Sequence, residues 1–212
     1  MKTNLSNHSK EIFFPFLNGD ISITDFEKTI STQNTLEDEL PSEIFSQLLA
    51  FDFKDKYAHQ NLVKFLNEQV IDVAEYETWK IKTTLNNLIA DPPNLPVYLN
   101  KLYQLYCGQP KDDGLRIFQF RFLGSLGLNY FYWMDEGYLK ANYGENWKLE
   151  YEKCLKGLDY YHQQLKPFAV EILDALENRE IIIRSDGTYQ ISEPLKQSLE
   201  GNVYQLIHPK HS

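Results

Sequence analysis

The chain has 212 residues, of which 42% are hydrophobic and 24% are charged, and these values exclude a chain that is disordered throughout. The length suffices for a core that is stable without disulfides. The formal net charge of −9 opposes binding to nucleic acid and to anionic membranes and favours basic partners. The ordinary explanation for such a charge, however, is that it keeps a protein soluble.

Tyrosine is abundant, with 14 Tyr beside 13 Phe and 3 Trp. A buried phenol needs a hydrogen-bond partner, so we expect many of these tyrosines at the surface. Exposed Tyr and Trp are favoured at binding surfaces, although compositional drift explains the count equally well.

The chain shows no sequence signal for secretion or for membrane insertion. Its N-terminus has no uninterrupted apolar segment of the signal-peptide type, and no apolar run approaches the ~20 residues that span a bilayer. The two cysteines, Cys107 and Cys154, fall in apolar helical patterns and are predicted to be buried free thiols. We therefore expect a cytoplasmic protein that does not bind membranes.

The N-terminal part is predicted to be frayed over the polar residues 1–10 and to turn at Asn18-Gly19-Asp20. Thr24 and Glu27 have the spacing of a capping box, which predicts a helix over residues 25–32. Pro41 marks the start of a second helix. The face that this helix should bury carries Ile44, Phe45, Leu48 and Leu49.

The middle of the chain continues with helical periodicity. Asp91-Pro92-Pro93 separates two predicted helices, because proline disfavours helix at the preceding residue. Composition predicts a loop over residues 109–114, and the aromatic segment 130–144 is predicted to be irregular. The helices predicted here cover residues 56–70, 72–90, 96–107 and 115–126.

The C-terminal part contains the longest helical stripe, over residues 147–177. Pro167 lies inside it and is expected to bend or split the helix. Asp186-Gly187 then predicts the turn of a β-hairpin, and a short helix is predicted over residues 194–199. The predicted fold is therefore a mainly α, compact multi-helix domain with a small C-terminal β-hairpin. We expect one domain over residues 1–212, with a possible sub-boundary near 91–94.

Catalytic and metal-binding motifs are absent from the sequence. The five histidines form neither a His-x-x-x-His nor a HExxH pattern, and His59 and His162 are predicted to lie on polar helix faces. Gly124-Ser125-Leu126-Gly127 lacks the spacing of a dinucleotide or P-loop site and indicates helix termination or close packing instead. We expect no metal, no cofactor and no enzymatic activity, and an enzyme with an unfamiliar site is the third alternative.

The hairpin that follows a helix over residues 171–191 has the arrangement of a winged-helix module. The recognition helix of such a module needs Lys and Arg to meet phosphates. Here Lys166 and Arg179 are outnumbered by Glu171, Asp174, Glu177 and Glu180. This balance disfavours DNA and favours a protein contact, so the alternative function is a winged-helix-like regulator or a protein–protein adaptor.

Residues 21–66 resemble the N-terminal segment of small bacterial immunity proteins, which are encoded beside polymorphic or contact-dependent growth inhibition toxins. The matching positions are Phe26-Glu27, Leu36-Glu37, Phe45, Leu48-Leu49 and Phe51-Asp52-Phe53. Residues 102–107 and 122–128 are similar to a second stretch of that family, and together the segments cover about a third of the chain. The chain departs from the pattern at Thr29, where a Trp is expected, and in a longer charged insert between Cys107 and Phe122.

The resemblance implies a non-catalytic protein that binds and occludes a cognate toxin, and the acidic charge favours a basic, nuclease-type toxin domain. We expect the contact within residues 111–144, where acids and aromatics mix in irregular chain. The aromatic side chains would fill pockets and the acids would steer the partner, unless the aromatics are core and the acids a hydrated rim. The candidate residues are Asp112, Asp113, Tyr130, Trp133, Asp135, Glu136 and Tyr138.

Overall fold

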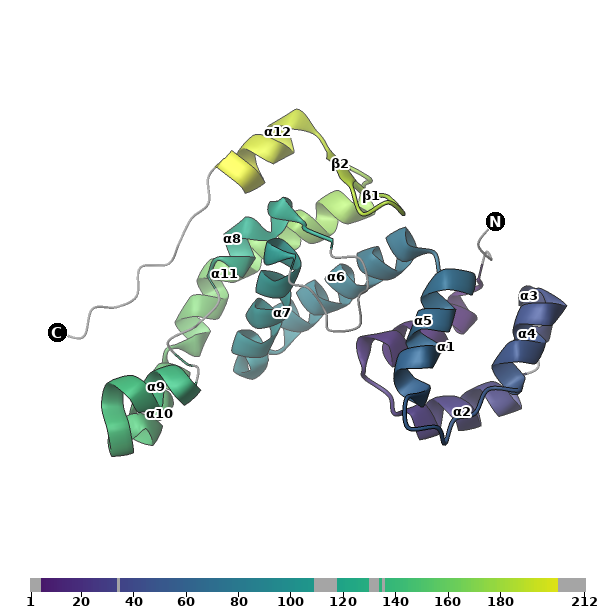
Figure 1. Cartoon of the computed structure of the whole chain (residues 1–212). Helices are drawn as coiled ribbons and strands as arrows, with labels where there is room; N and C mark the ends of the chain where they lie inside the picture. The colour runs from purple at the N-terminus through teal and green to yellow at the C-terminus, as the bar shows by residue number, and fades with distance from the viewer. Residues whose placement is uncertain (1–4, 34, 109–117, 130–133, 135, 202–212) are drawn as a thin grey trace. The chain divides into compact units, whose positions relative to one another are not determined.

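The computed structural model of the chain describes residues 5–33, 35–108, 118–129, 134 and 136–201 (Figure 1). These residues are mostly helical and include one two-stranded antiparallel hairpin near the C-terminus, which confirms the predicted fold class. They form two compact units, and the division falls between residues 80 and 81, inside helix α6 (Val73–Ala90). Whether the chain behaves as one folding domain stays a prediction.

The first unit is built from helices around a core of phenylalanines. Phe16 and Phe26 are fully buried and stack with ring centroids 4.2 Å apart. The ring centroid of Phe14 lies 5.4 Å from that of Tyr76 and 5.5 Å from that of Trp79. Both of these residues lie in the first half of α6. The helices before α6 are α1 (Asn7–Asn18), α2 (Ile23–Thr32), α3 (Thr35–Glu39), α4 (Ser42–Leu49) and α5 (Ala58–Gln69).

Helix α1 begins within the segment that was predicted to be frayed. The Ser6 hydroxyl caps it by accepting a hydrogen bond from the Ser9 N–H, and Leu5 is buried, so the prediction that residues 1–10 are frayed is wrong for residues 7–10. The helix ends at Gly19, which has a left-handed φ of 82°. The predicted turn at Asn18-Gly19-Asp20 is thereby confirmed.

The N-terminal cap of α2 is also displaced from its predicted position. Ser22 Oγ accepts from the Asp25 N–H at 3.1 Å and donates to Asp25 Oδ2 at 2.7 Å, so the helix is capped by Ser22 and not by Thr24. In α4, Leu48 is fully buried whereas Leu49 is 50% exposed. The prediction that Leu49 faces the core is therefore wrong, because this helix buries a narrower stripe than its apolar residues allow.

The second unit contains the rest of α6 and the helices that follow it. Two of them, α7 and α8, pack closely, since a Cβ built at Gly127 would lie 3.1 Å from the carbonyl oxygen of Leu102. Close packing was one of the two predictions for the 124–127 segment. The elements are 3-10 turn η1 (Pro92–Asn94), α7 (Leu95–Cys107), 3-10 turn η2 (Arg121–Leu123), α8 (Gly124–Gly127), α9 (Glu136–Tyr143), 3-10 turn η4 (Gly144–Asn146), α10 (Trp147–Lys156), α11 (Leu158–Glu177), β1 (Ile181–Ile183), β2 (Tyr189–Ile191), α12 (Glu193–Lys196) and π-turn η5 (Gln197–Gly201).

Two helix predictions in this unit are wrong in their bounds. Within the predicted helix 115–126, the described residues 118–120 are not helical, and only Arg121–Gly127 form short helical turns. Conversely, residues 136–143 of the segment predicted to be irregular form α9. Phe120 and Phe122 are fully buried, so tertiary packing outweighs helical periodicity in this apolar stretch.

The long helical stripe is interrupted at Gly157 and not at Pro167. Gly157 ends α10, with its N–H 3.0 Å from the Cys154 carbonyl oxygen, and α11 starts at the next residue. Pro167 lies inside the continuous helix α11, on its exposed side, so water can solvate the carbonyl group that lost its hydrogen-bond donor. The split predicted at Pro167 is wrong, since the segment divides at Gly157, and the bend predicted at Pro167 stays a prediction.

His162 is a core residue, which contradicts its predicted place on a polar helix face. Its side chain is 4% exposed, and its Nε2 lies 3.0 Å from the Leu88 carbonyl oxygen and 3.2 Å from that of Ile89. Carbonyl oxygens only accept, so Nε2 carries a proton and donates it to the C-terminal end of α6, where carbonyls have no partner within the helix. The ring thereby fastens α11 to α6.

Two replacements of His162 should distinguish the contribution of its hydrogen bonds to stability from the contribution of its packing. His162→Leu should lower the free energy of unfolding by about 2 kcal/mol, since it leaves buried carbonyls without a donor. His162→Gln should cost less than half as much, because its amide can donate from a similar position. Urea denaturation followed by circular dichroism measures both values. Equal losses would show that the hydrogen bonds contribute little.

The C-terminal hairpin turns where it was predicted to turn. Strands β1 and β2 pair antiparallel with Ile181 opposite Ile191 and Ile183 opposite Tyr189. Gly187 has a φ of 87°, and a Cβ at this position would lie 1.9 Å from Cδ1 of Phe118. Glycine is therefore required twice at this turn, for its backbone conformation and for the ring that lies against it.

A matched pair of variants distinguishes these two requirements. Gly19→Ala places alanine at a φ of 82° with no atom within 4 Å, so only backbone strain of about 1 kcal/mol is expected. Gly187→Ala has the same backbone strain and must also displace the Phe118 ring, so it should lower the free energy of unfolding by about 1 kcal/mol more than Gly19→Ala. Urea unfolding of both variants measures the difference. Equal costs would mean that the Phe118 ring moves away freely.

Candidate functional site

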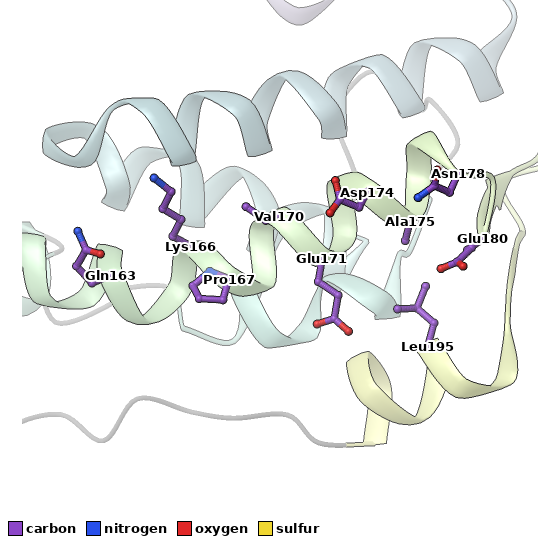
Figure 2. A pocket seen from close by; sticks show the side chains of 10 residues that line it. All are labelled: Gln163, Lys166, Pro167, Val170, Glu171, Asp174, Ala175, Asn178, Glu180 and Leu195. Carbon is purple, nitrogen blue, oxygen red and sulfur yellow. The ribbon is translucent and has the colours of Figure 1, made fainter.

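An open groove runs along α11 in the second unit (Figure 2). Its volume is about 700 Å³. Helix α11 supplies most of its lining, and α12 supplies the facing side chain of Leu195. The lining residues are Gln163, Lys166, Pro167, Val170, Glu171, Asp174, Ala175, Asn178, Glu180 and Leu195.

The spacing of the α11 residues explains why they line one groove. They recur every three or four positions, as Gln163, then residues 166 and 167, 170 and 171, 174 and 175, and then Asn178, so they follow one face of the helix. The opposite face is buried in the core of the unit. It carries Leu165, Ala169, Ile172 and Leu176.

The second wall of the groove exists because the chain reverses sharply after α11. Arg179 adopts a left-handed φ of 60°, and the Glu180 N–H then donates to the Ala175 carbonyl oxygen at 2.8 Å, as in a Schellman motif. After the hairpin, the Ser192 N–H donates back to the Glu180 carbonyl oxygen at 3.2 Å. Helix α12 therefore starts beside the end of α11.

Side-chain contacts hold α12 and η5 in place. Ser198 Oγ donates to Glu171 Oε1 at 2.9 Å, which joins η5 to the rim of the groove. The Tyr189 hydroxyl donates to Glu200 Oε1 at 2.5 Å, and its ring packs edge-on against Phe122. Burial, and then this hydrogen bond, raise the pKa of Tyr189, so its phenol remains a donor at neutral pH.

The groove combines an apolar floor with an acidic rim. Val170 is 37% exposed, and Pro167 and Leu195 extend the apolar surface. Around it lie three carboxylates, those of Glu171, Asp174 and Glu180, against the single ammonium group of Lys166. Such a surface can bind an apolar side chain that is flanked by Lys or Arg, and it repels phosphate groups.

The groove does not have the arrangement of a catalytic centre. Among the described residues, its lining contains no His, Cys or Ser, and Ser198, whose hydroxyl donates to the rim carboxylate of Glu171, lies outside that lining. In the described part of the chain, no group of three or more His, Cys, Asp or Glu side chains could hold a metal ion.

Of the residues predicted to bind the partner, the structure describes two, Glu136 and Tyr138, and neither lines the groove. Glu136 and Tyr138 lie in the first turn of α9, where Glu136 Oε1 pairs with Lys140 Nζ at 2.6 Å and Tyr138 is 38% exposed. The remaining predicted residues lie outside the described part of the chain. They are Asp112, Asp113, Tyr130, Trp133 and Asp135.

Part of the groove could have been identified from the sequence. The sequence shows an excess of acidic residues at positions 171–180, which disfavours DNA binding but does not by itself indicate a groove. No pattern indicated that Leu195 would face the end of α11 (Figure 2), because this placement depends on the left-handed turn at Arg179, a residue type without turn preference.

Comparison of the chain with protein-family models, with curated protein sequences and with solved structures finds no match. Among the described helices, none is both long enough and apolar enough to span a bilayer. A function can therefore be argued only from the groove and from the sequence itself.

The strained turn that shapes the groove yields a stability prediction. Arg179→Gly should leave the free energy of unfolding unchanged or raise it by up to about 1 kcal/mol, because glycine adopts a left-handed φ without strain. Gln164→Gly, at an exposed interior position of α11, should instead cost about 1 kcal/mol. Thermal and urea unfolding of the two variants provide the comparison. A loss at Arg179 as large as that at Gln164 would contradict the proposed strain.

Proposed function

We propose that this chain is a toxin-neutralising protein of the immunity type, which binds a basic toxin domain through the α11 groove and blocks it by occlusion. The observation that carries the proposal is the apolar floor of this groove inside a rim of three carboxylates. The resemblance of residues 21–66 to the N-terminal segment of immunity proteins supports the same function, as does the net charge of −9. The protein would act in the cytoplasm, where such a toxin meets its target, and without catalysis.

Each part of the groove has a role in such an interaction. An apolar anchor of the partner would occupy the floor beside Val170 and Leu195, and buried anchors of this kind contribute about 2 kcal/mol or more. Glu171, Asp174 and Glu180 would attract the partner's Lys and Arg and accelerate association. A nuclease domain carries such basic residues because it binds phosphates, so occupying them excludes its substrate.

A protein–protein adaptor is the second candidate, because the same groove could hold a basic segment of another protein. A regulator that binds DNA is less well supported, since Glu171 and Asp174 on α11 and Glu180 after it would repel phosphates. Protection of cells against a toxin distinguishes an immunity protein from an adaptor.

The proposal is tested with the C-terminal domain of the large protein encoded beside this chain's gene. Co-expression of the chain should restore growth of cells that produce this domain, and the purified proteins should form a complex. Absence of a toxic domain there, or no protection, would contradict the immunity function.

The groove is tested by reversing the charges of Glu171, Asp174 and Glu180 to Lys together. Association with the toxin domain at low salt should slow by about tenfold or more and lose its salt dependence. A matched control reverses three exposed acids of the first unit and changes the net charge equally. Its residues are Glu37, Glu43 and Glu68.

Equal effects of the two triple variants on the association rate would show that only net charge matters. They would contradict the proposal that the toxin domain binds in the groove. A further variant reverses the acids of the segment predicted from sequence. If this variant alone slowed association, the partner would bind that segment and not the groove. The residues reversed are Asp112, Asp113, Asp135 and Glu136.

A further inference from the structure

Helix α10 carries large apolar side chains that the second unit does not cover. The structure describes all ten of its residues, and none of them is buried. Tyr151 and Leu155 are 38% and 39% exposed, and Leu149 is 54% exposed. Surface helices normally bury their apolar stripe, so this one is short of a packing partner within the described chain.

The apolar residues of α10 lie on two separate faces of the helix. Trp147, Tyr151 and Leu155 follow one another at intervals of four residues and make one stripe along α10. Leu149 lies more than about 120° around the helix from the middle of this stripe. We call the first set the α10 stripe. It does not overlap with the groove, whose lining contains no residue of α10.

Neighbouring contacts define which side of the stripe is open. Lys140 Nζ and Lys148 Nζ lie 5.3 Å and 5.8 Å from the ring centroid of half-buried Trp147. Glu150 and Cys154 are also half-buried, and burial, followed by the Glu150 charge, raises the pKa of the Cys154 thiol. Helix α9 packs against α10 (Figure 1) and its Lys140 lies over Trp147, so the open part of the stripe is the part that carries Tyr151 and Leu155.

We propose that the α10 stripe is a homodimer interface, in which α10 of two copies packs antiparallel about a two-fold axis near Tyr151. This axis places Trp147 of one copy against Leu155 of the other, and Tyr151 against itself. A surface that is complementary to itself closes after two copies and does not propagate into a filament.

The charges beside the stripe favour a second copy in this orientation. Lys148 and Glu152 border it on one side and are four residues apart, as the stripe residues are. In an antiparallel pair, Lys148 of each copy approaches Glu152 of the other. A parallel two-fold pair would place equivalent side chains on opposite sides of the contact and would not bring Lys148 of one copy to Glu152 of the other.

The size of the interface sets the expected affinity. A helix of ten residues is about 15 Å long, so two such helices bury less area than a standard stable interface. We therefore expect a reversible dimer, with a dissociation constant on the order of micromolar, that forms without a toxin.

The test is sedimentation of the full chain over a concentration series. The mass should rise from one copy to two. Leu155→Glu should raise the dissociation constant by about tenfold or more, because it places a charge in the apolar contact. Leu149→Glu is the matched control on the same helix, and it should leave dimerisation unchanged although Leu149 is the more exposed leucine. Circular dichroism verifies that both variants remain helical.

A charge exchange tests the orientation independently of the apolar contact. Lys148→Glu and Glu152→Lys should each weaken the dimer, and the double variant should restore it. A monomer at every concentration would overturn the proposal, as would equal effects of Leu149→Glu and Leu155→Glu. Failure of the double variant to restore association would overturn the antiparallel arrangement.

Discussion

The packing of α11 is the constraint on which the second unit depends. One face of this helix carries Leu165, Ile172 and Leu176 into the core, and the same face brings His162 to the last carbonyls of α6. A hydrogen-bonded, buried imidazole is a directional contact inside an otherwise apolar interface, so it determines the rotation of α11 about its own axis. That rotation leaves the face from Gln163 to Asn178 outside.

The groove follows from this orientation together with the reversal of the chain at Arg179. Because α11 is covered on one side only, its outer face is available for a second wall, which α12 supplies through Leu195. The hydrogen bond from Ser198 to Glu171 joins η5, which follows α12, to the rim of the groove. The acids therefore lie beside an apolar floor, an arrangement that gives an interface both affinity and rapid association.

The α10 stripe and the α11 groove differ in the partner that they suit. The groove has an excess of three carboxylates over one ammonium group, so it complements a surface unlike itself. The stripe has Lys148 and Glu152 in equal number, so it complements a copy of itself. A single chain can use both surfaces at once, since they share no residues.

Local sequence features determined the types of element in this protein. Apolar periodicity predicted the helix over 72–90 to within one residue of α6, and Asp186-Gly187 predicted the hairpin turn, because helix periodicity and turn conformation depend on neighbouring residues. Only the tertiary structure decided that the long stripe breaks at Gly157, that His162 is buried, that Leu49 is exposed and that Leu195 faces α11. These outcomes depend on which surfaces meet across long separations in the chain. A helical pattern specifies which side chains share a face, and it leaves open whether that face meets the core, a partner or water.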